Sequence, residues 1–272
     1  MKDKRILITG GAGGLGAIAC WAFAAQGAHV VALDRGDDLE ERIAAARGTF
    51  ESLRASASHA TAGGTYEPHD VPAAISGSVR CLAADLADTP ALTRTIRAEI
   101  DARGGFDILI NNAAIYPSKP FLDYAEVELR AVHAVNTHAP LVLAQLLVPH
   151  MQRQHWGRIV NISSITFYGG WGELLPYVTS KGALVGATRA LARELGVHGI
   201  TVNCVSPGAF PTAAEAIHPD PEGYQAMVIG RQSIKHRGNA LDIANALQFF
   251  ASEHSGFVTG QVLAVDGGWY MN

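Results

Sequence analysis

The stretch Thr9-Gly10-Gly11-Ala12-Gly13-Gly14-Leu15-Gly16 follows the short apolar run Arg5–Thr9 and opens the Ala-rich segment Gly16–Gln26. This order predicts a strand, a tight glycine turn and a helix. Glycines at 10, 14 and 16 let a pyrophosphate approach the backbone, and a helix N-terminus offers free N–H groups and a positive dipole end. The stretch, with Leu15 beside these glycines, therefore predicts the first βαβ unit of a dinucleotide-binding sheet.

The rest of the chain repeats this alternation of short apolar runs and Ala-rich segments. Several runs are continuously apolar, which is typical of parallel strands buried on both faces. Strands are expected at Arg5–Thr9, His29–Asp34, Val79–Ala83, Phe106–Asn111, Arg158–Ser163, Thr201–Val205 and Gln261–Val265. Helices are expected at Gly16–Gln26, Thr89–Ala102, Asp123–Asn136, Ala139–Arg153, Val178–Leu195 and Asn239–Ala251.

This pattern predicts an α/β fold of one domain spanning residues 1–272. We expect a doubly wound, mostly parallel, seven-stranded Rossmann-type sheet with helices on both faces. The segment at about 36–78 contains a possible Ala-rich helix and a run of small polar residues, and it is longer than one crossover needs. It is interpreted either as a surface excursion or as an element that contacts a partner.

Composition limits the classes of partner. The 272 residues are 48% hydrophobic and 17% charged, with a formal net charge of -4, which argues against nucleic acid or an anionic membrane as the main partner. We see no uninterrupted apolar run of about 18 residues, so no membrane span is expected. The three scattered cysteines and the absence of zinc-type spacing among the histidines predict no metal and a reducing, cytoplasmic location.

Asp34 ends the second predicted strand. A carboxylate at this position accepts hydrogen bonds from the adenosine ribose hydroxyls and repels a 2′-phosphate, which favours NAD. The neighbouring Arg35 leaves NADP as an alternative, because a guanidinium binds phosphate well.

Ligands bind at the carboxyl ends of parallel strands, so residues that follow the other strands are further cofactor candidates. A polar side chain there can reach an adenine edge, small residues leave room for a flat ring, and a Pro-Gly turn can pack against nicotinamide. The candidates are Asp85, Leu86, Asn112, Ala113, Pro207, Gly208 and Thr212. For Asn112 a purely structural role, tying adjacent strands together, is the preferred alternative.

Tyr177 and Lys181 are four residues apart, so their side chains project from the same face of a helix. A free tyrosine phenol has a pKa of about 10, and a neighbouring ammonium lowers that pKa by favouring the phenolate. The pair therefore predicts that Tyr177 is a general acid or base.

Taken together, these motifs resemble the short-chain dehydrogenases/reductases, in the standard-length branch with one Rossmann-type domain. The resemblance covers about residues 4–270, except for the long segment after Asp34. It rests on Thr9-Gly10-x-x-x-Gly14-x-Gly16, Asp85, Asn111-Asn112-Ala113, Asn136, Ser164, Tyr177-x-x-x-Lys181, Pro207-Gly208 and Asp266-Gly267-Gly268.

The resemblance implies a role for each catalytic candidate. Tyr177 would be the acid/base, and Lys181 would lower its pKa and hold the nicotinamide ribose. Ser164, which has the family's spacing from Tyr177, would bind the substrate oxygen. Asn136 would hold a water that links Lys181 to solvent. The resemblance also implies a homotetramer with the helices Asp123–Arg153 and Val178–Leu195 at its main interface.

The substrate wall in this family comes from the segment after Ser164 and the loop after Gly208. The expected substrate-binding residues are Ser164, Phe167, Tyr168, Trp171, Tyr177 and Phe210, with Tyr224 and Met227 as further candidates. Ordinary packing or subunit contact is an alternative for about half of the aromatics. The run His218–Gly223 is interpreted as a lid tip, and the aromatic end Trp269–Asn272 is expected to pack on a neighbouring subunit.

We therefore expect an NAD-dependent short-chain alcohol dehydrogenase or carbonyl reductase that acts on a neutral, cyclic or aromatic secondary alcohol or ketone. One alternative is an NADP-dependent 3-oxoacyl-type or other carbonyl reductase. A more remote alternative is a non-catalytic nucleotide-binding protein, since a fold does not determine a function.

Overall fold

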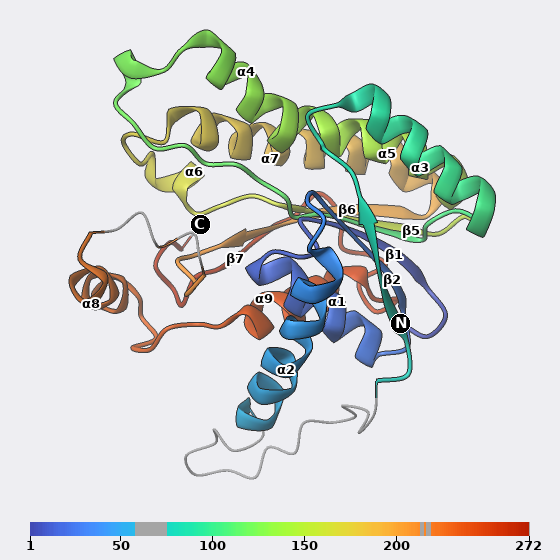
Figure 1. The fold of residues 1–272 in the computed structure, drawn as a ribbon, viewed down its shortest axis with the longest axis horizontal. Coiled ribbons are helices and arrows are strands. Elements are labelled where there is room, and N and C mark those ends of the chain that lie inside the picture. Colours follow the sequence, from blue (N-terminus) through green and yellow to red (C-terminus); the bar gives the residue numbers. More distant parts are fainter. Residues whose placement is uncertain (58–74, 213–214, 216–218, 272) are drawn as a thin grey trace.

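Seven strands form one parallel sheet in the order β3-β2-β1-β4-β5-β6-β7 (Figure 1). This computed structural model describes residues 1–57, 75–212, 215 and 219–271. The strands are β1 (Arg5–Thr9), β2 (His29–Asp34), β3 (Ser78–Ala83), β4 (Ile108–Asn111), β5 (Gly157–Ile162), β6 (Ile200–Pro207) and β7 (Val262–Val265). The strand order reverses between β1 and β4, which is where such sheets bind ligands.

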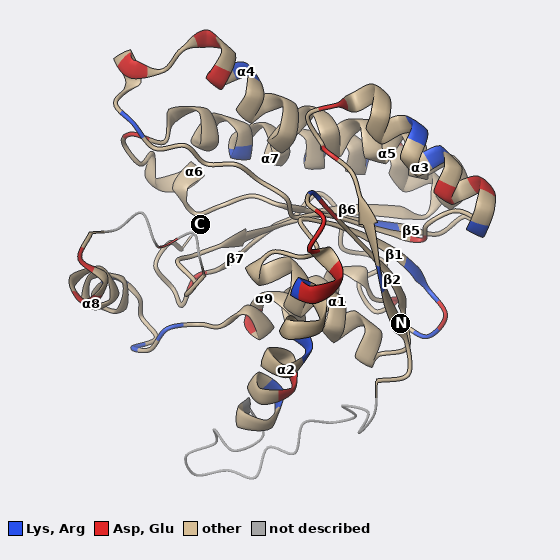
Figure 2. Cartoon of the chain, in the orientation of Figure 1, with Lys and Arg blue, Asp and Glu red and all other residues tan. Residues whose placement is uncertain are grey.

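Helices cover both faces of the sheet (Figure 1). One layer contains α1 (Gly14–Ala25), α2 (Leu39–Ala57) and α9 (Ala240–Ala251), and the other contains α3 (Thr89–Arg103), α4 (Glu126–His133), α5 (Ala139–Arg153) and α7 (Leu175–Leu195). Successive residues of β1 alternate between the two cores: Ile6 and Ile8 pack toward α1, and Leu7 packs toward α5. Charged residues lie mainly in the helices and loops that surround the sheet (Figure 2).

The predicted doubly wound sheet is confirmed, and all seven strands lie within two residues of their expected bounds. The possible helix in the segment at 36–78 is α2, while residues 58–74 of that segment lie outside the described residues. The expected helix Asp123–Asn136 differs, because α4 begins at Glu126 and passes through a π-helical turn, Ala134–His138, directly into α5.

Two α-helices among the described residues were not predicted. The short α6 (Thr166–Gly169) lies in the expected substrate wall, and α8 (Pro221–Arg231) begins inside the expected lid tip. The Asp220 side chain caps α8 by accepting a hydrogen bond from the Gly223 backbone N–H at 2.9 Å. Pro221–Gly223 form the first turn of a helix, the lid interpretation of this run stays a prediction, and His218 lies outside the described residues.

The continuous helical run Glu126–Arg153 is long and apolar enough to cross a membrane by length and composition. Its mean hydropathy is 1.3, and 39% of the 18-residue window is buried in the protein. This run contains charged residues, so it is not an uninterrupted apolar stretch of the kind that the sequence was searched for. The mean hydropathy of an 18-residue window can still be high when the window contains a few charges. One such helix is weak grounds for a membrane span, because core helices of soluble proteins pass the same test.

The carboxyl ends of β1 and β4 are tied together by Thr9 and Asn112. The buried Thr9 hydroxyl accepts hydrogen bonds from the backbone N–H groups of Asn112, at 3.0 Å, and Ala113, at 3.1 Å. In return, Asn112 Nδ2 donates to the carbonyls of Thr9, at 3.0 Å, and Gly10, at 3.1 Å. These bonds fix the start of the glycine turn relative to the next strand.

We expect Thr9→Val, which keeps the side-chain shape, to lower the free energy of unfolding by on the order of 2 kcal/mol or more. The change leaves two partly buried N–H groups without their acceptor. Chemical denaturation of both proteins measures this difference.

Thr201→Val is the matched control. The Thr201 hydroxyl is buried in β6 with no hydrogen-bond partner among the described residues, so its removal should be neutral or stabilising. Equal effects of the two substitutions would contradict the role assigned to Thr9.

Candidate active site

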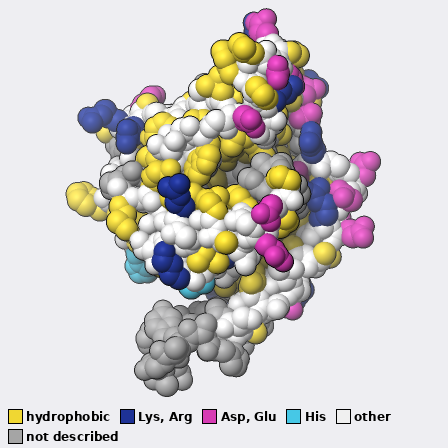
Figure 3. Space-filling model, turned by 90° about the vertical axis from the view of Figure 1, so that its left-hand side faces the viewer, with side chains coloured by type: hydrophobic (Ala, Val, Ile, Leu, Met, Phe, Trp, Pro, Cys, Tyr) yellow, Lys and Arg dark blue, Asp and Glu magenta, His cyan; other side chains and the backbone are white. Residues whose placement is uncertain are grey.

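A cavity of about 550 Å³ opens at the carboxyl ends of the central strands. Figure 3 views the molecule from the side on which α4 and α8 lie, and hydrophobic side chains gather around a recess in that face. The described residues that line the cavity include most of the expected cofactor set: Gly10, Gly14, Leu15, Asp34, Asp85, Leu86, Asn112, Ala113, Tyr177, Lys181, Pro207, Gly208 and Thr212. The structure therefore brings together residues from across the length of the chain.

The glycine turn shapes one end of this cavity. Gly10 has a φ of 63°, in the left-handed region that glycine tolerates best. Gly16 is not part of the lining: a Cβ atom there would come within 2.1 Å of the Gly10 carbonyl oxygen, so it serves close packing of the turn on α1. Gly13 precedes α1 and offers no side-chain cap, which leaves the first-turn N–H groups available to an anion.

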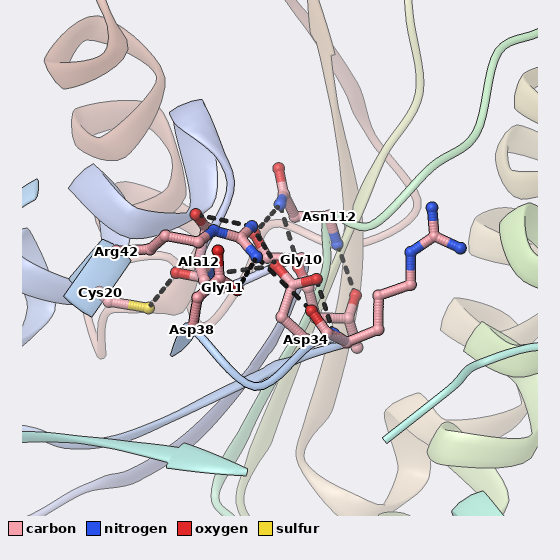
Figure 4. A network of polar contacts seen from close by, with 10 residues as sticks. Gly10, Gly11, Ala12, Cys20, Asp34, Asp38, Arg42 and Asn112 are labelled. Carbon is pink, nitrogen blue, oxygen red and sulfur yellow. Dashed lines mark hydrogen bonds and ion pairs between the residues drawn. The ribbon is translucent and has the colours of Figure 1, made fainter. Parts of the chain in front are cut away.

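Asp34 lies beside this turn, as expected, but it is already hydrogen-bonded by the protein (Figure 4). Its Oδ2 accepts the Ala12 backbone N–H at 3.0 Å, and its Oδ1 accepts the Arg35 backbone N–H at 2.8 Å. Arg42, which the sequence gave no reason to select, also lines the cavity, with its Nη2 3.5 Å from Asp34 Oδ2. Only the packing of α2 against the turn reveals this contact.

Ser164, Tyr177 and Lys181 meet at the other end of the cavity. Lys181 is buried, and its Nζ donates to the Ile162 carbonyl at 2.7 Å, so the ammonium is anchored to the end of β5. The same Nζ lies 5.4 Å from the centroid of the Tyr177 ring. The Ser164 hydroxyl is hydrogen-bonded to the Tyr177 phenol. A substrate oxygen bound here would contact a hydroxyl and a phenol together.

The expectation that Lys181 lowers the pKa of Tyr177 is not met. Burial raises the pKa of Tyr177 to about 12, and the hydrogen bond from Ser164 opposes this rise. Burial also lowers the pKa of Lys181 to about 8. Lys181 is not among the causes of the shift in the pKa of Tyr177, which are burial, Ser164 and Tyr116.

Asn136 lies in the π-helical turn and is completely buried. Its Oδ1 accepts the Ile115 N–H at 2.9 Å, and its Nδ2 donates to the Ile115 carbonyl at 2.9 Å and to the Ser180 hydroxyl at 3.0 Å. Ser180 in turn donates to the Tyr177 carbonyl at 2.7 Å. Both N–H bonds of this amide are engaged, so Asn136 links the loop after β4 to the first turns of α7, and its amide has no donor left for the expected water.

The expected substrate wall is only partly where the sequence suggested. Phe210 lines the cavity, whereas Phe167, Tyr168 and Trp171 do not belong to its lining. They join an aromatic cluster with the C-terminal segment: Tyr168 lies 6.4 Å from Tyr270 between ring centroids, and Trp171 lies 5.5 Å from Trp269. These two rings also pack within the same chain, and the expected contact of this segment with a neighbouring subunit stays a prediction.

Other residues line the cavity that contains Ser164 and Tyr177. They include Tyr116, Leu174, Glu215 and Tyr224. The Tyr116 ring meets the Tyr177 ring edge to face, with centroids 5.9 Å apart. Of the two extra candidates, Tyr224 lines the cavity, and Met227 on α8 is partly exposed outside its lining. Tyr116 follows the expected fourth strand closely, so strand-end position was the signal that could have identified it.

Two charges at this end neutralise each other. Arg237 forms an ion pair with Glu215, and its guanidinium carbon lies 5.9 Å from the centroid of the Tyr224 ring. Among the described residues, no group of three or more His, Cys, Asp or Glu side chains is arranged to hold a metal ion.

Comparisons with known proteins agree with this geometry. A family model described as enoyl-(acyl carrier protein) reductase matches residues 65–270. The chain is 37% identical over 268 residues to (2S)-[(R)-hydroxy(phenyl)methyl]succinyl-CoA dehydrogenase subunit BbsD of Thauera aromatica, covering 98% of this chain and 97% of the relative. It is 32% identical over 269 residues to D-xylose 1-dehydrogenase of Caulobacter vibrioides, covering 99% and 96%.

Solved structures show the same likeness. One is assigned as a short-chain alcohol dehydrogenase of Sinorhizobium meliloti 1021, with 30% identity and a TM-score of 0.82, covering 99% of this chain and 97% of the other. Another is assigned as an NAD(P)-dependent gluconate 5-dehydrogenase of Beutenbergia cavernae with bound NADP at low occupancy. It has the same identity, TM-score and coverage.

The pKa of Lys181 predicts a pH dependence of stability. Because this pKa falls from 10.5 in a free lysine to about 8 in the folded protein, the unfolded chain binds more protons between these values. The contribution of Lys181 to the free energy of unfolding should therefore rise as pH increases from about 8 to 10.5. This contribution is lost as pH falls through 8.

Urea denaturation at pH 7.5 and pH 10 tests this, with Lys181→Met as the comparison. We expect the wild type to gain stability relative to Lys181→Met across this window, on the order of a few kcal/mol. If the difference in free energy of unfolding between the wild type and Lys181→Met does not change with pH, burial does not destabilise the Lys181 ammonium.

Proposed function

The chain belongs to the short-chain dehydrogenase/reductase family, and from that premise we propose that it is an NAD-linked oxidoreductase that interconverts a secondary alcohol and a ketone. The observation that carries this proposal is the hydrogen-bonded pair of Ser164 and Tyr177, with Lys181 behind it, in the same cavity as the glycine turn. The pair supplies proton chemistry at an oxygen, and the turn fits a dinucleotide.

The donor set of the cavity fits the cofactor. The open N–H groups of α1 suit a pyrophosphate, Asp34 suits a ribose, and Pro207, Gly208 and Thr212 line the same cavity. When bound, a nicotinamide dinucleotide supplies the acceptor or donor of a hydride. The chain's own residues must then place the substrate and move its proton.

We assign that work to Ser164 and Tyr177. In oxidation, Tyr177 Oη takes the proton of the substrate hydroxyl while the Ser164 hydroxyl holds the substrate oxygen. In reduction, Tyr177 Oη returns a proton to the forming alkoxide. At neutral pH, Lys181 is mostly protonated, because its pKa of about 8 lies above 7, and its charge stabilises phenolate that forms during turnover. Asn136 and Ser180 hold the backbone of Tyr177 in place.

The proposed substrate is neutral and cyclic or aromatic. Tyr116, Leu174 and Phe210 give the cavity near Tyr177 an apolar and aromatic wall. The Arg237 guanidinium is already paired with Glu215, so it offers little attraction to an anionic substrate. The name of the Thauera aromatica relative, a dehydrogenase of a hydroxy(phenyl)methyl compound, supports an aryl carbinol.

A second candidate is an NADP-dependent 3-oxoacyl-type reductase. It is favoured by the 31% identity to 3-oxoacyl-[acyl-carrier-protein] reductase FabG of Thermotoga maritima and by the two arginines, Arg35 and Arg42, at the ribose end of the cavity. Asp34 favours NAD in the primary proposal.

A homotetramer is proposed for the assembled protein. The apolar run Glu126–Arg153 is only partly buried within one chain, which supports its being covered by a second copy. Light scattering coupled to size-exclusion chromatography would show four chains for this assembly, and a monodisperse monomer would contradict it.

We expect Tyr177→Phe to reduce kcat by on the order of 100-fold to 10,000-fold, because the phenylalanine ring cannot exchange a proton. NADH binding, measured by fluorescence, should change only a few-fold. Tyr168→Phe is the matched control outside the cavity lining and should keep its activity. Near-normal turnover by Tyr177→Phe would exclude the proposed acid/base.

The substrate proposal is tested by a panel of neutral aryl and cyclic secondary alcohols, each paired with a carboxylate-bearing analogue and assayed with NAD and with NADP. Neutral members should have the higher kcat/KM with NAD. Turnover of 3-oxoacyl thioesters alone with NADPH would favour the second candidate. No turnover by the whole panel, together with an unchanged biological role of Tyr177→Phe, would favour a non-catalytic nucleotide-binding protein.

A further inference from the structure

The Tyr124 phenol bridges the loop after β4 and the segment that leads into α7. Its Oη lies 2.8 Å from the Glu173 carbonyl oxygen and 2.7 Å from the Pro117 carbonyl oxygen. A phenol has one hydrogen to donate, so the two carbonyls share it. The Lys119 backbone N–H donates to the same Glu173 carbonyl at 2.9 Å. Two segments that are 49 residues apart are therefore joined at one carbonyl oxygen.

Glu173 adopts an unusual backbone conformation at this contact. Its φ of 62° lies in the left-handed region, which residues with a Cβ atom rarely adopt. Its side chain is exposed, and only its carbonyl forms a hydrogen bond to another described residue. Such conformations persist where the surrounding structure imposes them, and they are frequent near active sites. The donors from Tyr124 and Lys119 supply that constraint here.

The bridge is next in sequence to residues that line the cavity. Tyr116 lies in the loop after β4, Leu174 directly follows Glu173, and both belong to the cavity lining. Leu174 is also the N-cap residue of α7, and its carbonyl accepts the Val178 N–H at 2.9 Å. The conformation of Glu173 therefore determines how α7 begins, and Tyr177 lies in the first turn of that helix.

The two joined segments meet again at the proposed acid/base. The Tyr116 ring packs edge to face on the Tyr177 ring, with centroids 5.9 Å apart. Tyr116 is 38% exposed, so this ring contact alone holds its loop only weakly. Movement of the loop away from Glu173 would carry Tyr116 away from Tyr177 and widen the cavity between them and Leu174.

We propose that Tyr124 is a positioning residue for the proposed reaction: its phenol joins the loop after β4 to the start of α7, and this bond holds Tyr116 against Tyr177 and sets the width of the cavity there. The inference rests on the proposed function, in which Tyr177 exchanges a proton with the substrate. Tyr124 acts through other residues, since it is not part of the cavity lining. A preformed wall of fixed width gives a ligand its affinity and its selectivity for size.

Tyr124→Phe tests the bridge because it removes the donor and keeps the ring. Hydrogen exchange followed by mass spectrometry, without nucleotide or substrate, should become faster in both joined segments, residues 115–124 and 172–178. The expected increase is on the order of three- to tenfold, which corresponds to the loss of one hydrogen bond. An increase in residues 115–124 alone would overturn the proposal, because the phenol would then anchor only its own loop.

The same variant tests the positioning role with two alcohols of different width, 1-phenylethanol and 1-(2-naphthyl)ethanol. The KM for 1-phenylethanol should rise on the order of tenfold, because the wall has moved. The kcat should change less than about threefold, because Tyr177 and Ser164 remain in place. The ratio of kcat/KM for the narrow alcohol to that for the wide one should fall on the order of tenfold. An unchanged ratio would overturn the proposal.

Arg130→Ala is the matched control. Arg130 forms an exposed ion pair with Glu126 on α4, close to Tyr124 in sequence and outside the cavity lining. Its removal should leave hydrogen exchange in residues 172–178 and both kinetic constants unchanged. The melting temperature of each variant shows that it is folded.

Failure of the proposed function has a different result. In that case the wild type neither binds NADH nor oxidises any alcohol, whereas hydrogen exchange still reports whether Tyr124 joins the two segments. If the wild type binds NADH and oxidises alcohols but Tyr124→Phe behaves as Arg130→Ala does, the positioning role alone is refuted.

Discussion

The hydroxyl of Thr9 accepts two backbone hydrogen bonds from the turn that follows β4, and the Asn112 amide returns two to the turn that follows β1. These four bonds join the strands between which the order of the sheet reverses. The glycine turn can approach a ligand only if its first residues are fixed, since Gly10 has an unusual backbone conformation and Gly16 packs on its carbonyl. The cavity, the helix N-terminus beside it and the position of Asp34 all depend on this junction.

Local patterns in the sequence predicted the sheet well, because each strand has its own apolar run and each helix has its own composition. They predicted α8 poorly. Its start is rich in Pro, Asp and Gly, which are typical of turns, and only the side-chain cap of Asp220 on Gly223 shows that these residues begin a helix. Local sequence patterns also did not predict the π-helical turn that carries Asn136, because this turn depends on packing against the loop after β4.

The candidate site likewise contains features that the sequence predicted and features that only the structure shows. Spacing placed Tyr177 and Lys181 on one helix face, and the structure agrees, but spacing does not measure burial. The direction of both pKa shifts follows from burial and not from the attraction between the two groups. Arg42 and the Glu215–Arg237 pair were not predicted because their partners are brought to them by the tertiary fold. For the same reason, Trp171 was expected at a substrate and is instead in contact with Trp269, almost 100 residues later.

The aromatic cluster that joins Trp171, Trp269 and Tyr270 is held by contacts between rings, whereas the start of the glycine turn is held by the Asn112 side-chain amide, which donates to the carbonyls of Thr9 and Gly10. The cluster lies outside the cavity lining, so substitutions in it can change the packing of the C-terminal segment without disturbing strand pairing. Relatives of about one-third identity bear names that refer to D-xylose and to a phenyl-bearing succinyl-CoA. Changes confined to the C-terminal aromatic cluster would leave the hydrogen bonds between the ends of β1 and β4 intact.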